Sequence, residues 1–229
     1  MPDATDFFRD AWAVYRLVVE HDYLWHSHAG RGLESLLPTG RAVRFLDLAC
    51  GDSDTTARVL AGRELTRYVG VDRSAAALRE AGPNVSKLTG PAELVEADFV
   101  EFLESCPDTF DVIYIGLSAH HLGEAGLPRF FAGVAKCLAP GGVFAAYEPF
   151  TLPDETRADT VDRICAMALH FFAAMTPAQR QQVAEHVRGN DKPVSLATWD
   201  ALATAAGLSP LTRVVRSPDR LYELVSHTQ

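Results

Sequence analysis

The feature that most constrains this chain is a series of short apolar runs that alternate with helical segments. The runs span 43–48, 67–71, 93–97, 110–115 and 143–147. Each has the length of a strand, and the segments between them show the apolar spacing of helices. Strands that alternate with helices form a parallel sheet with right-handed crossovers. Because the strands are apolar almost throughout, we expect an α/β fold with helices on both faces of the sheet.

Helices are expected before and between these strands. One apolar helical face near the N-terminus consists of Phe7, Phe8, Ala11, Trp12, Tyr15, Val18 and Val19. Further helices are expected at about 23–37, 53–61, 75–81, 100–104 and 127–138. Gly82-Pro83 is expected to stop the helix over 75–81, and Pro140-Gly141-Gly142 the one that reaches Leu138.

The last third of the chain does not continue the alternation of strands and helices. Residues 154–187 are helical in pattern with no strand among them, which indicates a helical cap inserted after the fifth strand. A helix at 196–206 follows, and then strands at 211–215 and 221–225, whose short connection favours an antiparallel pair. We interpret 1–229 as one domain with a helical lid (1–40), a core (41–150), a cap (151–192) and a final helix with two strands (193–229).

Composition excludes some classes of protein. The 48% hydrophobic content is that of a globular chain, and a formal net charge of −9 disfavours a nucleic-acid partner. No apolar run is long enough for a membrane span, and the acidic start does not resemble a signal peptide, so we expect no membrane partner and a cytoplasmic location. The cysteines Cys50, Cys106, Cys137 and Cys165 form no C-x-x-C pair, so we expect reduced thiols.

Polar residues follow the first three strands. In an open α/β sheet, ligands bind beyond the carboxyl ends of the strands. After the first strand, Gly51 permits a tight turn, and the helix that follows offers free N–H groups to an anion. Asp72 stands about 20 residues further on, where such folds bind ribose hydroxyls. Asp98 beside Phe99 suits an adenine amine and ring. The alternative for both acids is helix N-capping.

The order of these segments resembles the motif series of class I S-adenosylmethionine-dependent methyltransferases. The resemblance covers about 41–150 and rests on Phe45-Leu46-Asp47-Leu48-Ala49-Cys50-Gly51-Asp52, Tyr68-Val69-Gly70-Val71-Asp72, Glu96-Ala97-Asp98-Phe99, Phe110-Asp111-Val112-Ile113-Tyr114 and Leu138-Ala139-Pro140-Gly141-Gly142. It implies a seven-stranded Rossmann-like sheet, parallel with an antiparallel last strand, and S-adenosylmethionine as cofactor. Ala49 and Ser53 stand where the family commonly has glycines, and Ala49 together with Asp54 argues against an NAD-binding G-x-G-x-x-G loop.

The resemblance also implies roles for single residues. The loop 47–51 borders the methionine part, Asp72 holds the ribose, and Asp98 meets the adenine amine with Phe99 beside it. The residues expected at the cofactor are Asp47, Ala49, Cys50, Gly51, Asp72, Arg73, Asp98, Phe99, Gly116, Leu117 and Tyr15. Those expected at the substrate are Tyr23, His26, Glu148 and His170. Trp25 and His28 are further candidates for the lid, and Tyr147, Phe150 and Met175 for the cavity wall.

The segment after the fourth strand lies where the methyl group is expected. It contains His120 and His121, of which His120 is the slightly preferred candidate for a general base. A structural or cofactor-contact role is the alternative for both. An Asn/Asp-Pro-Pro-Tyr segment, typical of enzymes that methylate nucleobase amines, is absent here. The acid that metal-dependent catechol-type enzymes carry at this strand end is also absent, so we expect no metal.

These observations predict an enzyme that methylates a small molecule, with oxygen ahead of nitrogen as the acceptor atom. Two alternatives stay open. The same cofactor can serve in the transfer of a group other than methyl, or the chain can be a catalytically silent cofactor-binding protein. We expect a monomer or a homodimer.

Overall fold

The chain folds around one seven-stranded sheet. The computed structural model describes the backbone from Trp12 onward and the side chains from Val14 onward, so the expected apolar face at Phe7, Phe8, Ala11 and Trp12 lies outside the described residues. The strand order is β3-β2-β1-β4-β5-β7-β6. The strands are β1 (Val43–Leu48), β2 (Leu65–Asp72), β3 (Ala92–Glu96), β4 (Phe110–Gly116), β5 (Leu138–Pro149), β6 (Thr212–Arg216) and β7 (Tyr222–Thr228). Strands β1 to β5 pair in parallel, and β7 is antiparallel to both β5 and β6. The expected fold class is confirmed.

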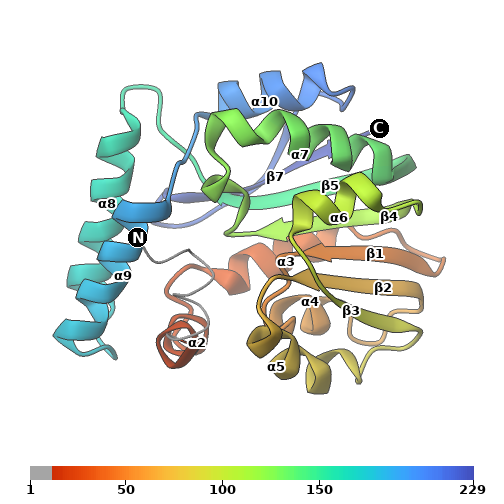
Figure 1. Ribbon diagram of the computed structural model, residues 1–229, viewed down its shortest axis with the longest axis horizontal. Coiled ribbons are helices and arrows are strands. Elements are labelled where there is room, and N and C mark those ends of the chain that lie inside the picture. The colour runs from red at the N-terminus through yellow and green to blue at the C-terminus, as the bar shows by residue number, and fades with distance from the viewer. Residues whose placement is uncertain (1–11) are drawn as a thin grey trace.

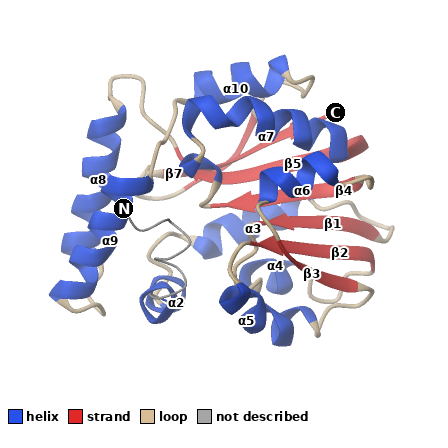
Figure 2. Cartoon of the chain, viewed as in Figure 1, coloured by secondary structure: helices blue, strands red, loops and turns tan. Residues whose placement is uncertain are grey.

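Helices cover both faces of this sheet (Figures 1 and 2). On one face lie α3 (His26–Leu36), α4 (Asp54–Val59) and α5 (Ala75–Val85), and on the other α6 (Phe99–Ser105), α7 (Gly123–Cys137) and α10 (Leu196–Ala205). Within the part of the chain that the structure describes, no helix combines the length and the apolar character needed to cross a bilayer.

Alternate residues of each central strand enter opposite halves of the core, as strand geometry requires. Phe45 and Val112 pack toward α3, together with Tyr68 and Leu224. Leu46, Ile113 and Phe144 pack toward α7 and α10, where Phe130, Phe131 and Trp199 form an aromatic cluster. Because both faces are buried, the strand ends are the places where the sheet presents polar groups to a cavity.

Two helices stand apart from these layers. The helices α8 (Arg157–Phe171) and α9 (Pro177–Asn190) form a hairpin beside the carboxyl ends of the central strands (Figure 1). A bridge between Thr151 and Ser195 joins the two ends of this insert. The N-terminal α2 (Trp12–Glu20) packs on it through Val14 and Val18, which contact Phe172 and Met175. The insert and α2 therefore form a cap over the carboxyl ends of the central strands.

Three expected boundaries were wrong. Helix α5 continues past Pro83, because Ser86 N–H still donates to Gly82 O at 3.0 Å and the proline removes only its own donor. Strand β5 begins at Leu138, inside the expected helix end, because Leu138 pairs with Phe110. The segment 154–187 is broken at 172–176, and a capping box of Thr176 and Gln179 starts α9.

The helix expected at about 23–37, as part of the lid over the cavity, also lies elsewhere. Helix α3 packs on the sheet beside β6 and β7, and of the described N-terminal residues α2 and Leu24 in the turn after it reach the cavity. Its Gly32 lies so close to β7 that a Cβ there would stand 2.6 Å from Leu224 Cδ2. A side chain at this position would require Leu224 or α3 to shift.

Candidate active site

A cavity of about 400 Å³ lies between the carboxyl ends of the strands and the cap. That volume is within the range of small-molecule sites. Its polar side is built from the loops after β1, β2, β3 and β4, and its apolar side from α2, α8 and α9. Of the residues expected at a cofactor, those that line it are Tyr15, Ala49, Gly51, Asp72, Arg73, Asp98, Phe99, Gly116 and Leu117. Segments far apart in sequence therefore meet at one rim of the sheet.

The loop after β1 has an unusual backbone. Ala49, Gly51 and Ser53 have φ values of 51°, 56° and 55°, all in the left-handed region. Glycine adopts this region freely, whereas other residues pay roughly 1–2 kcal/mol for it. This conformation explains why glycine suits the positions of Ala49 and Ser53. The loop nevertheless keeps its shape here, with a hydrogen bond between the hydroxyl groups of Ser53 and Tyr68, whose oxygens are 2.9 Å apart.

Asp72 ties this loop to the next one. Its Oδ2 accepts a hydrogen bond from Gly51 N–H at 2.9 Å, and its Oδ1 accepts from Ser74 N–H at 2.8 Å. The N-cap of α5 is Ser74, so Asp72 is not the cap itself. Burial raises the pKa of Asp72, although the two backbone donors oppose that shift. The carboxylate thus stands at the cavity edge with free lone pairs for a hydroxyl.

Asp98 serves as a helix cap and also lines the cavity. Its Oδ1 accepts from Val100 N–H at 2.8 Å and from Glu101 N–H at 3.1 Å, which makes it the N-cap of α6. Its Oδ2 lies 3.9 Å from Arg73 Nη1. The capping alternative from the sequence is therefore realised, and the second oxygen still borders the cavity next to Phe99.

A smaller pocket of about 50 Å³ adjoins the β1 loop. Asp47, Cys50 and His26 line this pocket and not the larger cavity, and Tyr15 and Leu117 line both. Asp47 is 2% exposed, and its Oδ2 accepts from Thr56 Oγ1 at 2.6 Å and Tyr68 Oη at 2.8 Å. Burial raises the pKa of Asp47 to about 7, against the effect of these hydroxyl donors.

The raised pKa of Asp47 predicts a pH-dependent stability. In the unfolded chain the carboxyl group has the ordinary aspartate pKa of 3.8, so the folded state holds the proton more tightly. The stabilisation is therefore present below about pH 4 and is lost as the pH rises toward 7. At about 1.4 kcal/mol per pKa unit, the loss amounts to a few kcal/mol. We expect the free energy of unfolding of Asp47→Asn, measured in urea and compared with that of wild type, to be higher at pH 8 than at pH 5. Parallel pH profiles of the two proteins would contradict this account of Asp47.

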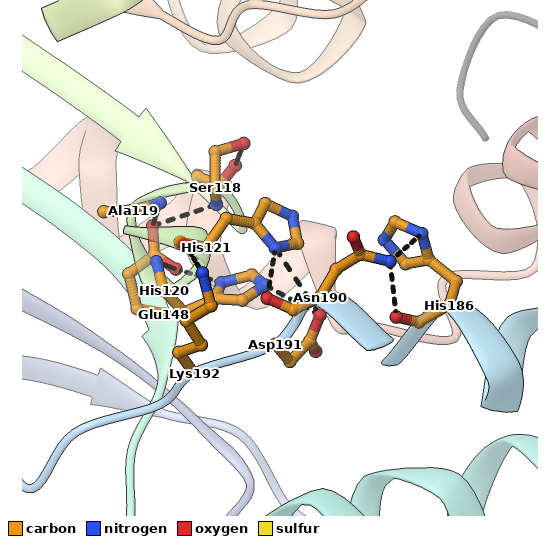
Figure 3. A network of polar contacts seen from close by, with 10 residues as sticks. Ser118, Ala119, His120, His121, Glu148, His186, Asn190, Asp191 and Lys192 are labelled. Atoms are coloured by element: carbon orange, nitrogen blue, oxygen red, sulfur yellow. Dashed lines mark hydrogen bonds and ion pairs between the residues drawn. The ribbon is translucent and has the colours of Figure 1, made fainter. Parts of the chain in front are cut away.

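A polar network surrounds the segment after β4 (Figure 3). Glu148, at the end of β5 and 1% exposed, accepts from the backbone N–H groups of Ser118 and Ala119 at 3.1 and 2.8 Å. Its Oε2 lies 2.6 Å from His120 Nδ1. Glu148 thus fixes the turn that carries both histidines, and its carboxylate lies behind the cavity wall.

The two histidines have opposite electrostatic environments. Burial lowers the pKa of His120, but the carboxylates of Asp191 and Glu148 outweigh it and raise the pKa to about 10. Burial and the adjacent charge of His120 lower the pKa of His121 to about 3. His120 contacts a carboxylate through each ring nitrogen, with Asp191 Oδ1 3.5 Å from Nε2. His121 is therefore the neutral imidazole at the cavity, and the geometry favours it over His120 as a base.

Comparisons with known proteins agree with this arrangement. The model of the methyltransferase domain family matches residues 45–142, which include Asp72, Asp98 and both histidines. Trans-aconitate 2-methyltransferase of Paracidovorax citrulli is 32% identical over 115 residues, 49% of this chain and 41% of that protein. Uncharacterized methyltransferase sll0829 of Synechocystis sp. is 33% identical over 102 residues, 44% of this chain and 45% of that protein. The chain spans less than half the length of these relatives.

Solved structures share the fold over nearly the whole chain. The DhpI–SAH complex superposes with a TM-score of 0.64 at 17% identity, covering 97% of this chain and 93% of that one. Mitomycin 7-O-methyltransferase MmcR gives a TM-score of 0.61 at 17% identity, covering 90% of this chain and 54% of that one. Residues 45–142 therefore belong to the methyltransferase domain family, whose members bind S-adenosylmethionine.

Several residues expected at the substrate of this methyltransferase lie elsewhere. His170 is on the exposed side of α8 and does not line the cavity, so the structure does not bring it to the expected substrate site. Tyr23 stacks on Phe172 with ring centroids 4.3 Å apart, and its hydroxyl accepts from Ala174 N–H at 2.7 Å, so it holds the cap together. Phe150 and Met175 are buried in the core and cap clusters. Helical periodicity alone does not distinguish the cavity face from these neighbouring faces.

Three other candidates have structural contacts or border the smaller pocket. Tyr147 donates from its hydroxyl to Leu24 O at 3.1 Å and lines the smaller pocket. Trp25 Nε1 donates to Asp219 at 2.7 Å, and its ring meets His28 edge to face. The hydrogen bonds of Tyr147 and Trp25 thereby anchor the N-terminal segment to β5 and to the turn between β6 and β7.

The sequence reasoning missed the end of α9. Asn190, Asp191 and Lys192 line the cavity opposite the histidine pair. Lys192 N–H donates to His120 O at 3.1 Å, and Lys192 Nζ donates to His121 O at 3.2 Å. A polar Asn-Asp-Lys run between a helix end and Pro193 was the available signal, since a buried acid at a helix end requires a partner.

Proposed function

We propose that this protein transfers the methyl group of S-adenosylmethionine to an oxygen atom of a small, largely apolar molecule. The observation that carries the proposal is a cavity in which the loops expected at the cofactor face an apolar cap, with His121 between them. Methyl transfer from a sulfonium requires in-line alignment and exclusion of water, and an apolar cap supplies both.

The cap side of the cavity supports the choice of acceptor. Its apolar lining comes from α2, α8, α9 and the turns that follow α2 and α8, and consists of Val14, Val18, Leu24, Ile164, Ala168, Phe172, Val183 and Val187. Polar groups gather at one end, near His121, His186 and Asn190. An acceptor that matches this surface has an apolar body and one polar end directed at His121.

The charges argue against a tricarboxylate acceptor. Some relatives bear the name trans-aconitate 2-methyltransferase, and trans-aconitate carries three carboxylates. Among the cavity-lining residues that the structure describes, the lysine and arginine side chains are Arg73, which faces Asp98, and Lys192, which binds His121 O. A trianion there would lack compensating charge, so we propose a different acceptor for this chain.

His121 supports oxygen as the acceptor atom. A neutral hydroxyl is a weak nucleophile, and a base within hydrogen-bond reach increases its reactivity. A neutral amine is a stronger nucleophile and depends less on such a base. The imidazole of His121 is neutral and borders the cavity. We therefore assign it as the group that accepts the hydroxyl proton.

The proposal is tested with methyl-labelled S-adenosylmethionine and a panel of hydroxylated apolar compounds, amines and trans-aconitate. We expect label on an apolar hydroxyl compound. His121→Gln should lower turnover about 100-fold or more, in the range for loss of a general base, while His170→Gln, the matched control on exposed α8, should leave it unchanged. Trans-aconitate as the best acceptor would contradict the acceptor class. The absence of any labelled product, with cofactor binding intact, would favour a silent protein.

A further inference from the structure

We propose that His120, His121 and Asp191 bind a divalent transition-metal ion of the zinc class at the acceptor end of the cavity. The three side chains come from two segments that are about 70 positions apart in the chain, the turn after β4 and the end of α9 (Figure 3). The expectation from sequence was a metal-free site, because the strand end itself carries no acid.

The spacing of the three groups fits a shared ion. All three ligand atoms lie within 4.8 Å of one another. Asp191 Oδ1 lies 3.5 Å from His120 Nε2 and 3.6 Å from His121 Nδ1. These distances are long for charge-assisted hydrogen bonds. They match the separation of about 3.3–3.5 Å between ligands that each lie about 2.0–2.2 Å from a tetrahedral zinc ion.

The unsatisfied oxygen of Asp191 is a second, independent observation. The Asp191 side chain is 7% exposed, and its Oδ1 is buried without a hydrogen-bond partner in the structure. Buried carboxylate oxygens are costly unless paired or bound to a metal. This oxygen lies at ion-pair distance from both imidazoles and forms a hydrogen bond with neither.

The surroundings complete such a site. Glu148 accepts from His120 Nδ1–H, which leaves Nε2 free for the ion and forms the carboxylate–histidine–metal arrangement. His121 Nδ1 is also 3.4 Å from Asn190 O, a weak contact that the ion would replace. A dication that displaces the proton of His120 would balance the two negative charges of Glu148 and Asp191.

The three ligands leave a tetrahedral ion one open position, and all three residues line the cavity. A bound acceptor hydroxyl there would release its proton to solvent more readily, because the ion stabilises the alkoxide. In that state the ion takes the place of His121 as the activating group. This consequence rests on the proposed function, whereas metal binding itself does not.

The test is metal binding by chelator-treated full-length protein. Calorimetric titration with Zn²⁺ should give one equivalent for wild type and for the control His170→Gln. Asp191→Asn and His121→Gln, which each remove a ligand at nearly constant size, should weaken binding by at least about 100-fold, and Glu148→Gln by about 10–100-fold. Co²⁺ bound to wild type should show the intense visible absorption of a tetrahedral site, which requires no variant to fold.

Two outcomes would overturn the proposal. One is a wild-type protein with no stoichiometric Zn²⁺ binding and no tetrahedral Co²⁺ spectrum, in which case a protonated His120 bridges the two carboxylates. The other is unchanged metal binding in folded Asp191→Asn and His121→Gln, which would place the ion elsewhere. Calorimetry of S-adenosylhomocysteine on the chelated protein distinguishes the two ideas. If the chelated protein does not bind S-adenosylhomocysteine but does bind Zn²⁺, only the proposed function is contradicted. If it binds S-adenosylhomocysteine but not Zn²⁺, only the metal site is contradicted.

Discussion

Replacing Glu148 by alanine is expected to lower the free energy of unfolding by about 3–5 kcal/mol, the range for removing one partner of a buried charged pair. Glu148 is 1% exposed and receives hydrogen bonds from two backbone N–H groups and the ring of His120. Alanine would leave these buried donors unpaired and would free the turn that carries both histidines. Urea unfolding at pH 7, with the midpoint and slope compared to wild type, measures the effect.

Two controls separate this role from a general effect of losing an acid. Glu148→Gln keeps an oxygen for the backbone donors and should cost clearly less than alanine. Glu104→Ala removes an exposed acid whose partner is Arg129 on the surface, so its cost should stay within about 1 kcal/mol. If Glu148→Ala and Glu104→Ala were equally mild, Glu148 would not be what fixes the histidine turn.

The second large effect is expected at the cofactor. Asp72→Ala should weaken binding of S-adenosylmethionine and S-adenosylhomocysteine by about 1–3 kcal/mol, the range for stranding a buried hydrogen-bond partner. The change removes the acceptor proposed for the ribose hydroxyls. It also frees Gly51 N–H, which donates to Asp72 Oδ2 at 2.9 Å and holds the β1 loop in place. Isothermal titration calorimetry with each ligand gives the affinities directly.

The matched control is Asp108→Ala, an exposed acid that pairs with Arg67 on the surface. It should bind both ligands as wild type does. Asp72→Asn retains one oxygen and should lie between wild type and alanine. Equal affinities for wild type and Asp72→Ala would remove Asp72 from the cofactor site.

Much of the fold was predictable because the strands are buried on both faces. The expected strand at 43–48 has the observed bounds of β1, and the antiparallel end of the sheet followed from the short link between the last two strands. The errors came from local signals that tertiary contacts override. Pro83 suggested a helix end, yet only one donor is lost there and α5 continues to Val85.

The residues of the candidate site also fall into those that the sequence could predict and those that it could not. Asp72 and Asp98 were predictable because strand ends of a parallel sheet share one edge. The preference for His120 over His121 could not be corrected from sequence, since it depends on Asp191, which approaches from the end of α9. The pattern of 154–187 did not show which side of α8 is exposed or where the helix ends, so it could not show that His170 faces solvent and that Met175 lies in the turn after α8, among the cap residues.

The most direct test of the account is a crystal structure with S-adenosylhomocysteine bound. The account predicts adenine between Asp98 and Phe99, ribose hydroxyls on Asp72, and the methionine end along the β1 loop toward the smaller pocket. The sulfur should then face the histidine turn and the apolar cap. A nucleoside bound away from Asp72 and Gly51, or a sulfur directed away from His121, would contradict the central claim that one cavity holds both cofactor and acceptor.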